Sequence, residues 1–99
     1  MKNNTKQLLL DAAIAESEES SYLTISRPAI AERAGVAGSL IQYHFGTMGK
    51  FRRAIVGEAI KTTNLKILAQ ALANNDSRAL GLPKKTKQKV SSSLKGNSL

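Results

Sequence analysis

The chain has 99 residues, of which 41% are hydrophobic, with no tryptophan and only two tyrosines and two phenylalanines. This length suits one domain with a modest core, and the absence of cysteine excludes disulfides, thiolate metal sites and cysteine nucleophiles. No stretch approaches the roughly 18 apolar residues of a membrane-spanning helix, and the polar start lacks the apolar core of a signal peptide. A cytoplasmic location is therefore expected.

The formal net charge of +8 is unevenly distributed along the chain. Residues 1–76 carry a net charge of +2, whereas residues 77–99 carry +6 and contain no aspartate or glutamate. Such an asymmetry indicates a polyanionic partner, either nucleic acid or an acidic membrane surface. A solvated tail whose lysines only increase solubility explains the same charge, and both interpretations stay open.

The first predicted element is a helix from residue 5 to about residue 17, capped by Asn4 or Thr5. Its apolar side chains recur at helical spacing. The following segment, SEESS, breaks this pattern, which predicts a frayed helix end and then a connection. Three acidic side chains are expected to form a solvated face there: Glu16, Glu18 and Glu19.

Two short helices joined by a glycine-containing turn are predicted next. Ser26 is a favourable N-cap, Pro28 fits the first helical turn, and Gly35 suits the left-handed residue that ends a helix. The inward-facing positions of this helix are predicted to be Ala29, Ile30 and Ala34. Val36 is expected to be a buried plug before a second helix over residues 37–45. This arrangement is the signature of a helix-turn-helix.

A long helix over about residues 48–74 is expected after Thr47, which can cap it. The segment that follows contains Pro83, which can open a short basic helix; otherwise the segment is disordered. The predicted fold is all-α. Residues 1–75 form a three-helix helix-turn-helix unit with a long fourth helix, and residues 76–99 form a basic C-terminal segment.

The distal half of this long helix carries a leucine stripe with no evident partner in the first three helices: Leu65, Leu68 and Leu72. Leaving such side chains in water is unfavourable by roughly 1.5–3 kcal/mol each. A second copy of the helix is the simplest cover, which predicts a homodimer and a palindromic DNA site. Alternatively the chain folds back on itself, and the covering residues are then Leu80, Leu82, Val90 and Leu94.

The most specific pattern is AIAERAGVAGSLIQYHFGTMGKF, in which IAERAGV supplies a helix, the turn glycine and an apolar residue, and YHF ends the second helix. With the opening segment TKQLLLDAA and the capping Ser26, this order over about residues 5–60 resembles the DNA-binding domain of TetR-type transcriptional regulators. The resemblance implies a regulator, by family habit a repressor, that binds double-stranded DNA.

The chain also departs from the family pattern. Glu16 and Ser17 stand where the family usually has leucine and phenylalanine, which predicts a thinner core there, and Gln42 replaces a common tyrosine. Met48 stands where the family has a lysine that approaches phosphate. Nearby cations can replace that lysine: Lys50, Arg52 and Arg53. The family's large ligand-binding and dimerising domain has no counterpart here, so no small-molecule sensor is expected.

Candidate DNA-binding residues lie mainly in the predicted recognition helix. Four have side chains suited to close approach or base-edge contact: Ala37, Gly38, Ser39 and Gln42. The resemblance assigns base or phosphate contacts to Tyr43 and His44. The competing interpretations are that Tyr43 packs on the start of the following helix and that His44 is a capping or core histidine.

Phosphate contacts are expected at two helix starts. Thr47 and Lys50 lie at the start of the predicted long helix, where backbone N–H groups favour an anion, and Arg27 begins the helix after Ser26. Thr47 can equally act only as a cap, and Arg27 can be a solvated surface residue. Each alternative needs no ligand.

The sequence thus predicts a small DNA-binding regulator with no enzymatic activity, cofactor or metal site. His44 is the only histidine, and no histidine–carboxylate cluster has the spacing of metal ligands. Two rival hypotheses stay open. One is a protein-interaction module that uses the apolar side of the long helix. The other is the truncated remnant of a longer regulator.

Overall fold

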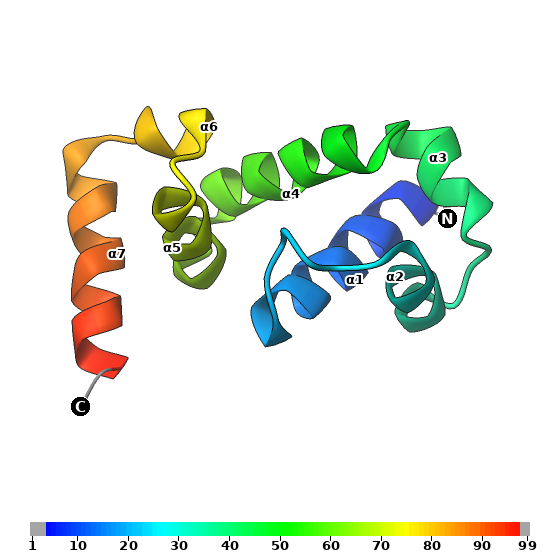
Figure 1. The fold of residues 1–99 in the computed structure, drawn as a ribbon, viewed down its shortest axis with the longest axis horizontal. Helices are drawn as coiled ribbons and strands as arrows, with labels where there is room; N and C mark the ends of the chain where they lie inside the picture. Colours follow the sequence, from blue (N-terminus) through cyan, green and yellow to red (C-terminus); the bar gives the residue numbers. More distant parts are fainter. Residues whose placement is uncertain (1–3, 98–99) are drawn as a thin grey trace. The chain divides into compact units, whose positions relative to one another are not determined.

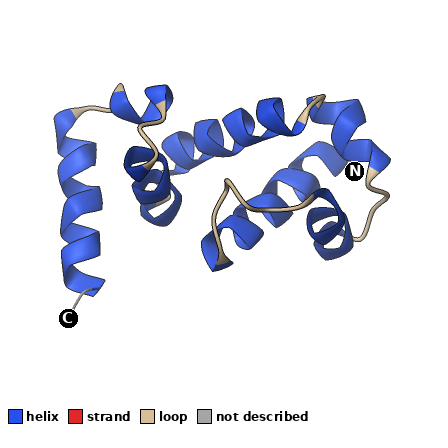
Figure 2. Ribbon diagram, in the orientation of Figure 1, coloured by secondary structure: helices blue, strands red, loops and turns tan. Residues whose placement is uncertain are grey.

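The computed structural model describes the backbone of residues 4–97 and the side chains of residues 4–92. This part of the chain is all-helical and contains no strand, which confirms the predicted fold class (Figure 2). Its elements in chain order are α1 (Thr5–Glu19), α2 (Arg27–Ala34), α3 (Ser39–Phe45), α4 (Met48–Thr62), α5 (Leu65–Ala73), α6 (Ser77–Leu80) and α7 (Lys84–Asn97).

The helices group into two compact units, residues 1–55 and residues 56–99, and α4 contributes to both (Figure 1). Unit 1 contains α1, α2, α3 and the first half of α4. Unit 2 contains the rest of α4 together with α5, α6 and α7.

The first helix is longer than its sequence pattern predicts. The Asn4 side chain caps it by accepting a hydrogen bond from the Gln7 N–H at 3.0 Å, and the helix continues through Ser17 to Glu19. Ser17 is fully buried, and its hydroxyl donates to the Ala13 carbonyl oxygen at 2.7 Å. Because this bond satisfies the hydroxyl inside the helix, a polar residue is tolerated where a large apolar one was expected.

The acidic end of α1 was predicted to be a solvated face. It also forms ion pairs with α2. The Arg33 guanidinium of α2 donates to Glu16 through Nε and to Glu19 through one terminal nitrogen, each at 2.7 Å. These hydrogen bonds raise the pKa of Arg33, and the bond to Glu16 contributes most, followed by the bond to Glu19. These contacts join α1 to α2, so the departure at Glu16 serves the packing of unit 1.

The core of unit 1 lies between α1 and the two short helices that pack on it. Its fully or almost fully buried apolar side chains include Leu9, Ala13, Tyr22, Ile30, Ile41, Phe51 and Ile55. In α2 the buried neighbour of Ile30 is Ala31, whereas Ala29 and Ala34 are only half-buried. Val36 is also half-buried, so the predicted plug is only partial.

The predicted long helix is broken into two. Thr63 adopts the left-handed conformation with φ 54°, and α4 ends there. The N–H of Asn64 donates to the Ala59 carbonyl at 2.8 Å, which is the bond of a Schellman helix end. The Asn64 side chain then caps α5 by accepting from the Ile67 N–H at 3.2 Å. A single continuous helix was therefore a wrong prediction.

A short helix that had not been predicted, α6, lies between α5 and the Pro83-initiated α7. Asn75 takes φ 57° after α5, and the Asp76 side chain caps α6 by accepting from the Arg78 N–H at 3.0 Å. Pro83 stands directly before α7, and the C-terminal segment is helical there rather than irregular. Proline fits this place because the first turn of a helix leaves its N–H groups without partners.

The leucine stripe is partly covered within the chain, because α5 packs against both α6 and α7. Leu68 is fully buried, Leu65 and Leu72 are half-buried, and on the covering side Leu82 and Val90 are buried. Leu80, by contrast, is 47% exposed, and the Leu94 side chain lies outside the described residues. The chain therefore folds back on the stripe, which removes the reason for expecting a homodimer.

Thr63→Gly should stabilise the protein by about 1 kcal/mol, because a residue with a Cβ atom loses roughly this much in the left-handed conformation. Urea unfolding followed by circular dichroism measures the change. Thr62→Gly is the matched control: Thr62 closes α4 in ordinary helical backbone, so glycine there should lower stability. An unchanged or lower stability for Thr63→Gly contradicts the assigned backbone strain.

Candidate nucleic-acid interface

The first helix of the helix-turn-helix is closed at both ends by local interactions. The Ser26 side chain caps α2 by accepting from the Ala29 N–H at 3.3 Å. At the other end Gly35 has φ 73°, and the N–H groups of Gly35 and Val36 both donate to the Ala31 carbonyl, at 2.9 and 3.1 Å. These bonds turn the chain sharply toward α3.

The turn brings Gly38 close to α2. Gly38 occupies the N-cap position, and a Cβ atom on it would lie 3.9 Å from the Cβ of Ala31. The second helix was predicted to begin at residue 37, but the first regular helical residue is Ser39, so Ala37 and Gly38 belong to the turn. Ala37 is exposed at this entry, and Gly38 is half-buried.

The seven residues of α3 divide into two faces. Ile41 is fully buried and Phe45, four residues later, is half-buried, so both belong to the inner face. Ser39, Gln42 and Tyr43 are exposed, and Tyr43 presents 80% of its surface to solvent. This exposure rules out packing of Tyr43 on the start of α4. The three polar side chains share one face because helix positions three and four apart are neighbours.

His44 lies at the border between these faces. It is half-buried, and its ring meets the Tyr43 ring edge-on, with the centroids 4.9 Å apart and the planes at 83°. This is a favourable geometry for two aromatic rings. His44 thus supports the exposed Tyr43 ring instead of lying in the core.

An aromatic contact holds α3 on the rest of unit 1. The rings of Phe45 and Phe51 stack with centroids 4.3 Å apart and planes at 26°. The ammonium group of Lys6, on α1, lies 5.6 Å from the Phe45 ring centroid, within cation–π range. Neither Phe51 nor Lys6 was predicted to support this site. A lone lysine carries no local signal for such a contact.

The connection from α3 to α4 presents two of the predicted phosphate-binding residues. Gly46 has φ 81° and ψ −123°, and its N–H donates to the Gln42 carbonyl at 2.9 Å. Thr47 Oγ1 accepts from the Lys50 N–H at 3.1 Å, which confirms the predicted cap. Both Thr47 and Lys50 are exposed, so their polar groups are accessible.

Two arginines of unit 1 carry an unsatisfied donor. Arg27 begins α2 and Arg52 lies in α4, and both side chains are half-buried. Their Nε atoms are buried and have no hydrogen-bond acceptor among the described residues. Buried donors in proteins are nearly always paired, so these two Nε groups are exceptions.

The described residues contain no cluster of three histidine or acidic side chains that could hold a metal ion. Among the same residues, no helix has the length and apolar character needed to cross a membrane. Comparisons with protein family models, curated proteins and solved structures found no match to this chain. The interpretation of the site therefore rests on its own geometry and on the sequence pattern.

Gly46→Ala should destabilise the protein by about 1–3 kcal/mol, because only glycine readily adopts this combination of φ and ψ. The added Cβ would also lie 3.3 Å from Cδ of Lys50. Gly49→Ala is the control, since the added Cβ there makes an ordinary 3.7 Å contact with Thr47 Oγ1 inside a helix. It should stabilise by about 0.5–1 kcal/mol. Equal urea midpoints for the two variants would contradict this account.

Proposed function

We propose that this chain binds double-stranded DNA sequence-specifically, with α3 in the major groove. One observation carries the proposal. The exposed face of α3 holds Ser39, Gln42 and Tyr43, on a short helix that follows α2 through a glycine turn and is anchored from behind by Phe45. A helix-turn-helix presents its second helix to the groove in this manner.

The side chains of the exposed face suit hydrogen bonding to base edges. The Gln42 amide can pair bidentately with adenine, and the Ser39 hydroxyl can donate to or accept from a base. The Ala37 methyl group, exposed in the turn, can contact a thymine methyl. None of these groups is charged, so contacts from this face would contribute sequence preference more than general affinity.

Phosphate contacts would surround this face. The exposed Thr47 and Lys50 lie at the start of α4, where backbone N–H groups and the helix dipole favour an anion. Arg27 and Arg52 are half-buried cations of the same unit, and their charge would also attract a phosphate. Such contacts set the position of the protein on the duplex.

The TetR-like order of residues supports a role in transcriptional regulation, as a repressor. The leucine stripe no longer supports a homodimer, because α7 covers α5 within one chain. The proposal therefore does not require a second chain on the DNA site. Light scattering of the protein with and without its selected duplex gives the number of chains on each site.

Gln42→Ala should relax one position of the DNA motif selected from random duplexes and cost about 1–3 kcal/mol on the preferred site, since a bidentate base contact is lost. Gln88→Ala, an exposed glutamine of α7, is the control and should leave the motif and the affinity unchanged. If Gln42→Ala selects the parent motif at every position, Gln42 does not contact a base.

Binding to duplex DNA should weaken steeply with salt, with log affinity falling by about 0.9 per phosphate contact for each unit of log salt. Lys50→Ala should reduce this slope by about 1 and weaken all sequences alike, because a lysine on phosphate carries no base information. Fluorescence anisotropy at several salt concentrations measures both effects. A salt-independent affinity would contradict duplex binding through phosphates.

A further inference from the structure

Most of the net positive charge belongs to unit 2, which does not contain the helix-turn-helix. Residues 56–99 include eight of the fifteen lysines and arginines but only two of the seven acidic residues, so they carry +6 of the net +8. The candidate DNA-binding site contains no residue of this unit. A strong positive potential on a separately packed unit indicates an acidic ligand of its own.

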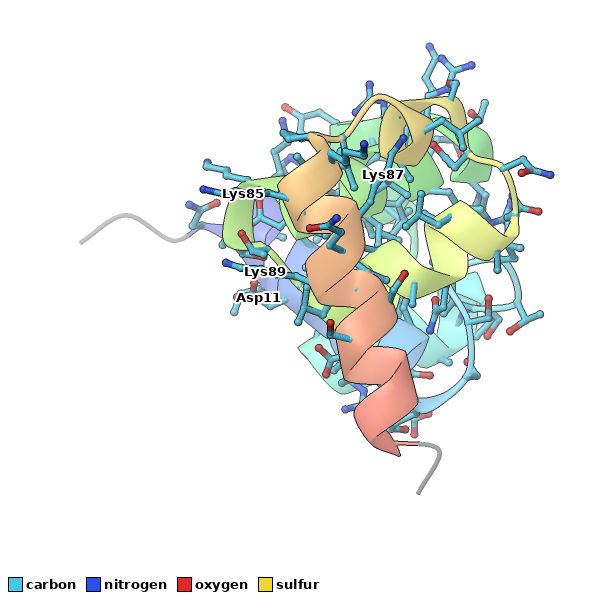
Figure 3. All side chains as sticks on the ribbon, turned by 90° about the vertical axis from the view of Figure 1, so that its left-hand side faces the viewer. Asp11, Lys85, Lys87 and Lys89 are labelled. Carbon is cyan, nitrogen blue, oxygen red and sulfur yellow. The ribbon has the colours of Figure 1, made fainter. Side chains whose placement is uncertain are left out.

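A groove in unit 2 lies between α5 and α7. It is lined by Leu65 from α5 and by four residues of α7: Lys85, Gln88, Lys89 and Ser92. These four are spaced at i, i+3, i+4 and i+7, which places them on one stripe of the helix. Lys85 and Lys89 project from the same side of α7, whereas Lys87 leaves it on another side (Figure 3).

The lining combines an apolar floor with two cations. Leu65 is half-buried, and the aliphatic stems of Lys85 and Lys89 can extend the apolar surface while their ammonium groups stay in water. The groove is open to solvent and not enclosed, so it suits an elongated ligand better than a small molecule, most of whose surface must be buried. Such a ligand needs apolar groups flanked by anionic ones.

We propose that this groove binds an acidic amphipathic helix of a partner protein. Two carboxylates four residues apart on that helix would match Lys85 and Lys89, which are also four residues apart, about 6 Å at their Cβ atoms. An apolar side chain between the carboxylates would lie on Leu65. This is recognition of a helix in a groove, and it does not depend on DNA binding by unit 1.

Two other occupants fit less well. The phosphates of duplex DNA would attract the lysines but gain nothing from the apolar floor at Leu65. A second copy of the chain carries the same net charge of +8, which opposes its association with a basic groove. The partner helix therefore comes from another protein.

The test uses the full chain and a labelled synthetic peptide of about 16 residues, long enough to form a helix, with paired glutamates and leucines on one face. Lys85→Gln/Lys89→Gln should weaken peptide binding about fivefold or more in fluorescence anisotropy, since two ion pairs are lost. The control Lys61→Gln/Lys84→Gln removes the same charge from exposed lysines outside the groove and should change binding less than twofold. Leu65→Ala should weaken the peptide but not a random duplex.

Circular dichroism and urea unfolding establish that each variant is folded. If Leu65→Ala does not fold, the comparison of the two double lysine variants still decides the test. Equal losses for both lysine pairs would overturn the proposal, because they would reflect net charge alone. If Lys85→Gln/Lys89→Gln weakens only duplex binding, the groove contacts the DNA backbone and the proposal is wrong. The proposal is also wrong if the unchanged protein does not bind the peptide. Selection of a DNA motif by α3 is measured separately, so either proposal can fail alone.

Discussion

The stacking of Phe45 on Phe51 is the contact on which the candidate DNA-binding surface depends. An isolated helix of seven residues is not stable in water, since too few hydrogen bonds offset the cost of nucleation. Helix α3 exists because Phe45 and the fully buried Ile41 attach its inner face to unit 1. The same attachment leaves Gln42 and Tyr43 facing solvent, so the core contact also determines which side chains can meet a ligand.

The two units differ in the chemistry that they present. Unit 1 is nearly balanced in charge, with +2 over residues 1–55, and its exposed recognition face is neutral. Unit 2 is strongly basic and holds a groove with an apolar floor between two lysines. Neutral hydrogen-bonding groups suit discrimination between bases, whereas lysines beside leucine suit a ligand that is both acidic and apolar. This division motivates separate ligands for the two units.

The sequence by itself determined the helical class and most helix boundaries. Ser26 and Gly35 close α2, Thr47 caps α4 and Pro83 precedes α7, each as its residue type predicts, whereas α6 was not predicted. These signals are legible because a cap acts through hydrogen bonds to groups within about four residues, so its energetics is contained in a short stretch of sequence. The face of α3 that carries the polar candidates follows from the same local periodicity.

Tertiary structure decided the features that depend on how helices dock. Arg33 meets Glu16 across 17 positions of sequence, and α7 packs against α5 although α6 and two turns separate the helices. The break at Thr63 was missed because a β-branched residue rarely takes the left-handed conformation, although Asn64 before an apolar run could have been recognised as a cap. Contacts between distant segments leave no periodic pattern in the sequence, because they form only when the helices pack together.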